Sequence, residues 1–128
     1  MDTRAKVVNA EQVSELLARN SSNGNRLVVA RGWFDVLRAS HCRLLAEAKG
    51  QGGRLVVLLH TDSDEHPTIL EQSARAQLVA AVAAVDAVVL CDAAQSEQLI
   101  ASWAPAAIVE EPAGSNLVND VLERYRPA

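Results

Sequence analysis

Short runs of apolar residues alternate along this chain with segments that have the spacing of amphipathic helices. The runs are rich in Val, Leu, Ala and Ile, and each is short enough to be a strand buried on both faces of a sheet. They cover residues 27–30, 55–59, 87–90 and 106–109. Since parallel strands are joined by helical crossovers, the alternation predicts a parallel sheet with helices on both faces. We therefore expect an α/β fold, a Rossmann-like three-layer sandwich with a parallel sheet of four to five strands.

The expected helices follow from amphipathic spacing and from the residues that begin or end helices. In Glu11–Arg19, for example, Val13, Leu16 and Leu17 fall on one face. A polar stretch over 61–68, which contains Pro67, predicts a loop. The other helices are expected at about 40–49, 71–84, 96–102 and 116–125.

Length and composition are those of one compact unit. The chain has 128 residues, of which 49% are hydrophobic and only 3% aromatic. Small apolar side chains allow helices to pack closely on a short sheet, and the length fits a single domain. Because neither an internal repeat nor a long linker divides the sequence, we predict one domain over 1–128.

Charge and apolar patterning exclude several classes of partner. The formal net charge of −4 disfavours non-specific binding to nucleic acid. No apolar run approaches the roughly 20 residues of a membrane-spanning helix, so we expect no membrane partner and a cytoplasmic location. Cys42 and Cys91 are far apart and have neither disulfide-framework nor metal-ligand spacing.

The loop after the first predicted strand is the favoured place for a ligand. In open parallel sheets, ligands bind beyond the carboxyl ends of the strands, where the strand order reverses. Here that loop covers 31–39 and leads directly into a predicted helix. The start of a helix is itself favourable for an anion, because its backbone N–H groups and its dipole point there.

The sequence from Gly32 to His41 reads GWFDVLRASH. It resembles the G-x-F-D-x-x-H-x-G-H signature of the cytidylyltransferase-like nucleotidyltransferases. Gly32, Phe34, Asp35 and His41 match that signature. Arg38 stands where the first histidine is expected, and Ser40 stands where the last glycine is expected.

The resemblance extends along nearly the whole chain and is closest to the heptose 1-phosphate adenylyltransferase branch of that family. Stretches that resemble it in order and spacing are 6–8, 41–48, 54–57, 61–62, 75–76, 85–89 and 99–100 with Pro105. The resemblance implies transfer of a nucleotidyl group from a nucleoside triphosphate to a phosphorylated small molecule, with release of pyrophosphate. Mg²⁺ would be required for activity, and no side chain is assigned as a metal ligand.

Site residues are implied by the same resemblance. Arg38 and His41 would be catalytic, neutralising the α- and β-phosphates, and Arg75 would bind the acceptor. The residues assigned to the nucleotide are Gly32, Trp33, Phe34, Asp35, Ser40 and Ser115. For Phe34 and Asp35 we favour bracing of the loop over direct contact, and for Trp33 we favour packing over stacking on a base.

Several positions depart from the family pattern and leave two interpretations open. Arg38 either holds phosphate oxygens or is a surface residue of a retired site. Ser40 is expected to cap the following helix. His41 either faces phosphate or makes a structural hydrogen bond at the helix end. Glu110 lies where relatives carry a lysine, which reverses a charge beside the pocket.

Other polar residues carry weaker signals. Asp62, Asp64, Glu65 and His66 form a cluster that suits a hard cation, but a solvated turn is the preferred interpretation. His60 ends a buried strand near the expected crevice. Relative to the family pattern, the apolar and glycine positions that form the fold are kept, while polar positions that would contact the ligand are changed. We therefore expect either a transferase with weak or altered activity, or a non-catalytic binding or assembly module, with a homodimer as one possible form.

Overall fold

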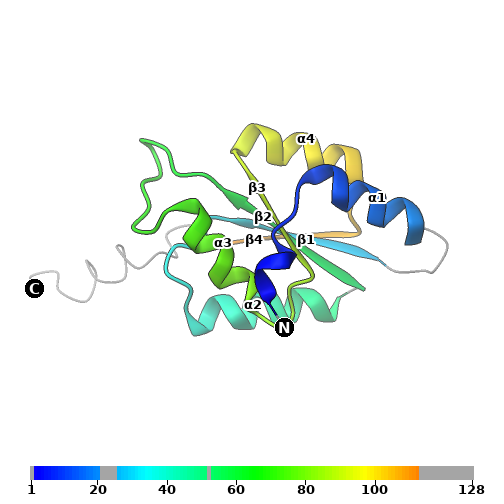
Figure 1. Ribbon diagram of the computed structural model, residues 1–128, viewed down its shortest axis with the longest axis horizontal. Helices are drawn as coiled ribbons and strands as arrows, with labels where there is room; N and C mark the ends of the chain where they lie inside the picture. Colours follow the sequence, from blue (N-terminus) through cyan, green and yellow to red (C-terminus); the bar gives the residue numbers. More distant parts are fainter. Residues whose placement is uncertain (1, 21–25, 52, 113–128) are drawn as a thin grey trace, which may run out of the picture.

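The computed structural model describes residues 2–20, 26–51 and 53–112 of the chain. Helices and strands alternate through these ranges (Figure 1). In chain order the elements are η1 (Thr3–Lys6), α1 (Ala10–Asn20), β1 (Leu27–Gly32), α2 (Ala39–Gly50), β2 (Arg54–His60), α3 (Gln72–Ala80), β3 (Ala87–Cys91), α4 (Ala93–Trp103) and β4 (Ala107–Glu110).

The four strands form one parallel sheet in the order β3-β2-β1-β4. Helices α2 and α3 cover one face of the sheet, and α1 and α4 cover the other (Figure 1). This arrangement confirms the predicted α/β three-layer fold. The described strands number four, within the expected four to five.

Each central strand is apolar on both sides because each side faces a helical layer. In β1, Val28 and Ala30 belong to the core beneath α2 and α3, whereas Val29 belongs to the core beneath α1 and α4. All three side chains are fully buried. The edge strand β4 differs, since Ile108 is 45% exposed. The buried apolar runs therefore predicted the centre of the sheet best.

Two helix boundaries differ from the sequence-based expectation by more than one residue. Helix α3 ends at Ala80, whereas a helix to residue 84 was predicted. Helix α4 begins at Ala93, three residues earlier than expected, because Asp92 and Gln95 form a reciprocal capping box. The predicted helix at 116–125 lies outside the described residues.

The sheet changes direction between β1 and β4. These strands are neighbours in space although about 80 residues separate them, and Ala30 pairs with Val109 in the parallel register. From β1 the chain continues to β2 on one side, while β4 joins the other side at the end of the described sheet. The loop after β1 and the residues that follow β4 therefore emerge together, at the place where a ligand site is expected.

Candidate functional site

A pocket of about 280 Å³ opens at the carboxyl edge of the sheet between β1 and β4. It is where the first loop was predicted to bind a ligand. Lining residues come from four parts of the chain, namely the end of β1, the end of β2, the start of α4 and the end of β4. Among them are Arg31, Gly32, Trp33, His60, Glu110 and Glu111.

The carboxylate of Glu111 lies against the loop that follows β1. Its Oε1 accepts a hydrogen bond from the backbone N–H of Trp33 at 3.1 Å, and its Oε2 accepts one from the N–H of Phe34 at 3.2 Å. Nε2 of His41 lies 2.8 Å from the same Oε2. That contact has ion-pair distance but not hydrogen-bond alignment. The two N–H groups and His41 thus form an anion cradle, which here holds a carboxylate.

His41 is oriented by the start of its own helix. It is 1% exposed, and its Nδ1 accepts a hydrogen bond from the backbone N–H of Arg38 at 3.1 Å. The ring also meets the edge of the Phe34 ring at a centroid separation of 5.4 Å. Since Nδ1 is an acceptor, the proton of the neutral ring lies on Nε2, the atom that faces Glu111. The structural hydrogen bond at the helix end, one of the two alternatives weighed from the sequence, is thus present. The phosphate-facing role of His41 stays a prediction.

The backbone of the loop is held in an uncommon conformation. Phe34 and Val36 have backbone φ angles of 46° and 52°, in the left-handed region that residues other than glycine seldom adopt. Such strain persists only where the surroundings enforce it. Glycine is needed at position 32 because the chain approaches Glu111 closely there. A Cβ at this position would lie 2.6 Å from the Cβ of Glu111. The end of β1 therefore requires glycine for Glu111 to reach the loop.

Asp35 and Arg75 brace the loop from behind. The Asp35 carboxylate accepts hydrogen bonds from the N–H groups of Ile69 and Leu70 at 2.7 and 3.1 Å, which supports the predicted bracing role. Arg75 is fully buried, and its Nη1 donates to the carbonyls of Trp33 and His60 at 2.7 and 2.8 Å. Burial lowers the pKa of its guanidinium. The assignment of Arg75 to acceptor binding stays a prediction.

Trp33 packs within the protein, as we favoured from the sequence. Its ring stacks on that of His66 at a centroid separation of 3.6 Å, and the ring of His60 meets it edge-on at 4.9 Å. The indole N–H donates to the carbonyl of Thr61 at 3.0 Å. The face that covers His66 is thus already occupied.

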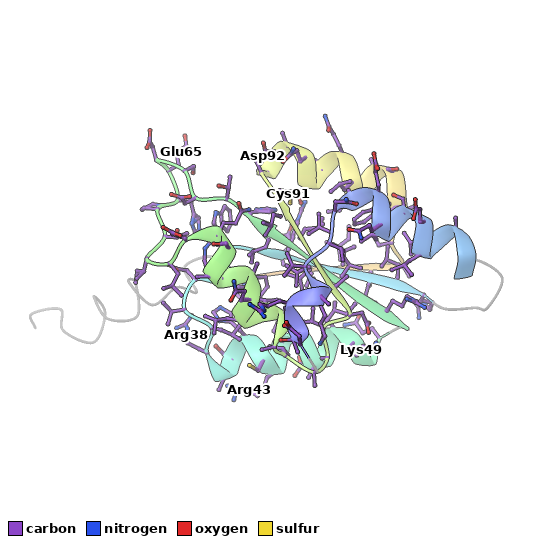
Figure 2. All side chains as sticks on the ribbon, in the orientation of Figure 1. Arg38, Arg43, Lys49, Glu65, Cys91 and Asp92 are labelled. Carbon is purple, nitrogen blue, oxygen red and sulfur yellow. The ribbon has the colours of Figure 1, made fainter. Side chains whose placement is uncertain are left out.

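The expectation that Ser40 caps α2 is wrong. The helix begins at Ala39 with Arg38 in the capping position, so exposed Ser40 is its second residue. The capping acceptor is instead the imidazole of His41. Figure 2 shows Arg38 at the turn that leads into α2. The assignments of Arg38 and Ser40 to the ligand stay predictions, and Ser115 lies outside the described residues.

The mouth of the pocket carries a second group of charges. Arg31 pairs with Glu97 at 2.6 Å and also with Glu110. Both carboxylates raise the pKa of the Arg31 guanidinium, and Glu110 has the larger effect. Glu110, where a lysine was expected, is therefore balanced by Arg31. Nearby His60 is 7% exposed, and burial followed by the charge of Arg31 lowers its pKa.

Other predicted features have simpler outcomes. Glu65 lies at the outer tip of the loop between β2 and α3 (Figure 2). Within 2–20, 26–51 and 53–112, no group of three or more His, Cys, Asp and Glu side chains is arranged to hold a metal ion. Cys42 and Cys91 are free thiols, and burial raises the pKa of Cys91 to about 11. None of the helices in the described ranges has the length and apolar character of a membrane-spanning segment.

Sequence reasoning missed Glu111, the residue whose carboxylate occupies the cradle. We had singled out its neighbour Glu110 for its charge. The signal that would have found Glu111 is topological, since the residue after β4 emerges beside the loop after β1. The backbone bond from the N–H of Glu111 to the carbonyl of Arg31, 3.0 Å long, fixes that position.

A parallel sheet covered on both faces, with an anion cradle between β1 and α2, defines an α/β domain of the nucleotidyltransferase fold. The family model described as cytidylyltransferase-like matches residues 29–125. The chain belongs to the cytidylyltransferase-like family, as its resemblance predicted.

Curated relatives agree with this assignment. The chain is 40% identical over 114 residues to the bifunctional protein HldE of Koribacter versatilis, covering 84% of this chain and 23% of that protein. It is 33% identical over 129 residues to the HldE of Campylobacter curvus, covering 91% of this chain and 27% of that one. The chain thus spans about a quarter of the length of these relatives.

Among solved structures, the lipopolysaccharide core biosynthesis protein from Thermoplasma volcanium GSS1 has a similar fold. The TM-score is 0.64 at 24% identity, and the similarity covers 79% of this chain and 86% of that one. At this identity the likeness supports the fold alone.

Proposed function

We propose that this chain is a nucleotidyltransferase-type domain that transfers a nucleotidyl group from a nucleoside triphosphate to a sugar or polyol phosphate, with weak or altered activity. The observation that carries the proposal is the anion cradle made by the N–H groups of Trp33 and Phe34 with His41. Its place at the β1–β4 reversal and the membership of the cytidylyltransferase-like family support the same conclusion.

The chemistry asks little of the protein beyond positioning and charge neutralisation. A phosphate oxygen of the acceptor forms a bond to the α-phosphorus, and the bond from that phosphorus to pyrophosphate breaks. Backbone N–H groups and His41 Nε2 would donate to the oxygens on which negative charge accumulates. Arg38, which precedes α2 by one residue, would add a permanent positive charge.

A preformed magnesium site is not part of the described residues. No suitable cluster of carboxylates occurs in the ranges the structure describes, and Glu97 and Glu110 are engaged by Arg31. Among the described residues we assign no magnesium ligand. The ion would enter as a counter-ion of the triphosphate, and its chemistry would be neutralisation of phosphate charge.

Three departures from the family pattern support weak or altered activity. Arg38 cannot place a donor where an imidazole would, and Ser40 adds a side chain at a position where glycine was expected. Glu110 adds a carboxylate at the pocket. An incoming triphosphate thus meets more negative charge than the family pattern provides for.

Release of pyrophosphate is the direct test. The pure protein would be incubated with ATP or CTP, Mg²⁺ and a panel of sugar and polyol phosphates. We expect slow release above the protein-free rate with at least one pair, and a loss of that release in Arg38→Ala. Arg43→Ala, which removes an exposed arginine of α2, is the matched control and should leave the rate unchanged. No release with any pair would contradict the proposal.

A non-catalytic nucleotide-binding or assembly module, including a homodimer, is the second candidate. It is favoured by the occupation of the cradle by a carboxylate of the protein itself. For this candidate, ATP or CTP at a hundred times its dissociation constant should stabilise the fold by about 2.7 kcal/mol without pyrophosphate release. Sedimentation equilibrium would test the homodimer separately.

A further inference from the structure

We infer that Glu111 is an internal ligand, which competes with the phosphoryl group of an incoming substrate for the anion cradle. The inference rests on the proposed function in so far as that function supplies a phosphorylated substrate. Glu111 would thereby set how tightly the site binds anions, and its departure from the cradle would be a condition for binding.

The contacts make the two ligands mutually exclusive. Glu111 uses the N–H of Trp33, the N–H of Phe34 and the Nε2 of His41, at 3.1, 3.2 and 2.8 Å. A backbone N–H has one hydrogen to donate, so a phosphate oxygen bound at the same three atoms must replace a carboxylate oxygen. Like charges in one small site also repel each other.

Burial indicates that the Glu111 carboxylate is a stable occupant of the cradle rather than a transient surface contact. The Glu111 side chain is 8% exposed, whereas Glu110, one residue earlier, is 61% exposed. A buried carboxylate is tolerated only where hydrogen bonds or an opposite charge compensate for lost water, and here two backbone N–H groups donate to it. The same compensation is what a phosphoryl group would need.

The backbone keeps Glu111 in place to compete. Its N–H donates to the carbonyl of Arg31 at 3.0 Å, and its Cβ lies against Gly32. A tethered group acts at a high effective concentration, because binding costs it no translational freedom. If the cradle is open only about a tenth of the time, the apparent dissociation constant of an external anion rises about tenfold.

Removal of the carboxylate is the test, with inorganic phosphate and pyrophosphate as probes. Glu111→Ala should bind pyrophosphate at least about tenfold more tightly than the wild type in isothermal titration calorimetry. Its melting temperature should also rise with phosphate concentration, since the anion replaces the missing partner of His41. Glu110→Ala is the matched control, because it removes the same charge from the adjacent residue without opening the cradle.

The outcomes separate the hypotheses. Equal affinities of wild type and Glu111→Ala, or an equal gain in Glu110→Ala, would overturn the inference, the latter by showing a general charge effect. Glu111→Gln keeps the shape of the side chain and should give a smaller gain, which preserves the test if the alanine variant folds poorly. Tighter pyrophosphate binding by Glu111→Ala, without transfer by any variant, would support the inference and contradict the proposed function alone.

Discussion

Two sets of contacts between carboxylates and nitrogen-bearing side chains lie at the same edge of the sheet. They differ in the burial of the side chains rather than in the distance between the contacting atoms. The inner pair joins His41 to Glu111 at 2.8 Å, and the outer group joins Arg31 to Glu97 at 2.6 Å and to Glu110. The inner side chains are 1% and 8% exposed, whereas the outer carboxylates are 69% and 61% exposed. Short distances are common to both, so water rather than geometry decides which group matters for stability.

The number of donors also separates the two groups. Glu111 receives two backbone hydrogen bonds in addition to His41, so its carboxylate depends on the fold of the β1–α2 loop. The outer carboxylates share one guanidinium and are otherwise exposed to solvent. Adjacent glutamates, Glu110 and Glu111, therefore have different roles, because successive residues at the end of a strand point in opposite directions.

Breaking the inner pair should have the largest effect. His41→Ala removes the imidazole Nε2 that lies against the buried Glu111 carboxylate, and it leaves α2 without its capping acceptor. We expect a loss of about 3 kcal/mol in the free energy of unfolding, measured by urea denaturation at neutral pH. A loss below about 1 kcal/mol, the range of an exposed pair, would remove the distinction between the groups.

The close approach at Gly32 should give the next largest effect. Gly32→Ala places a Cβ 2.6 Å from that of Glu111, so we expect a loss of roughly 1–3 kcal/mol from overpacking. In a Glu111→Gly background the same change should cost less, since the opposing Cβ is gone. An equal cost in both backgrounds in chemical denaturation would show that Glu111 is not what Gly32 accommodates.

His60 connects the outer group to the dependence of stability on pH. Burial first, and then Arg31, lower its pKa from 6.5, while Asp92 and Glu111 act in the opposite direction. The unfolded state thus takes up a proton near pH 6.5 that the folded state takes up only at lower pH. The contribution of the neutral His60 ring to the free energy of unfolding is therefore fully present above about pH 6.5, and it decreases as the pH falls below 6.5.

The measurement for His60 is a series of urea midpoints between pH 8 and pH 5. We expect a smaller acid-side decrease in His60→Gln than in the wild type. Arg31→Ala should also reduce the decrease, since it removes a charge that opposes protonation of His60. Curves of identical shape in all three proteins would show that His60 does not contribute.

The smallest effect is expected for the outer carboxylate of α4. Glu97→Gln should change the free energy of unfolding by about 0.5 kcal/mol or less, because the side chain is 69% exposed and Arg31 keeps Glu110. What difference remains should vanish at about 1 M salt, where charges are screened within about 3 Å. A cost equal to that of His41→Ala would make the two groups equivalent.

The sheet could be predicted well from the sequence because a strand that is buried on both faces consists of consecutive apolar residues. Leu55 to Leu59 have no polar residue among them, and the strand that contains them extends only from Arg54 to His60. The start of α4 was placed too late because the Asp92–Gln95 capping box was not recognised. The end of α3 was placed too late because alanines at 81, 83 and 84 are compatible with helix and with turn.

The candidate site was predicted in its location but not in its content. The residues Gly32 to His41 resembled a family motif, and they do surround the cradle. Glu111 carried no local signal, since its role depends on contacts with residues 77 and 78 positions away in the chain. Spacing within a motif does not report what another strand brings to it. The capping role expected for Ser40 failed for a related reason, because His41 supplies the acceptor.

The place of β4 at the margin of the described sheet has a consequence for biogenesis. This strand pairs with β1 alone, and it brings Glu111 to the loop that precedes α2. During synthesis, β1, β2 and β3 are made well before it, so we expect the N–H groups of Trp33 and Phe34 to remain exposed to water until β4 docks. Satisfaction of those donors is therefore a late event, and protection of their amide hydrogens from exchange would report its completion.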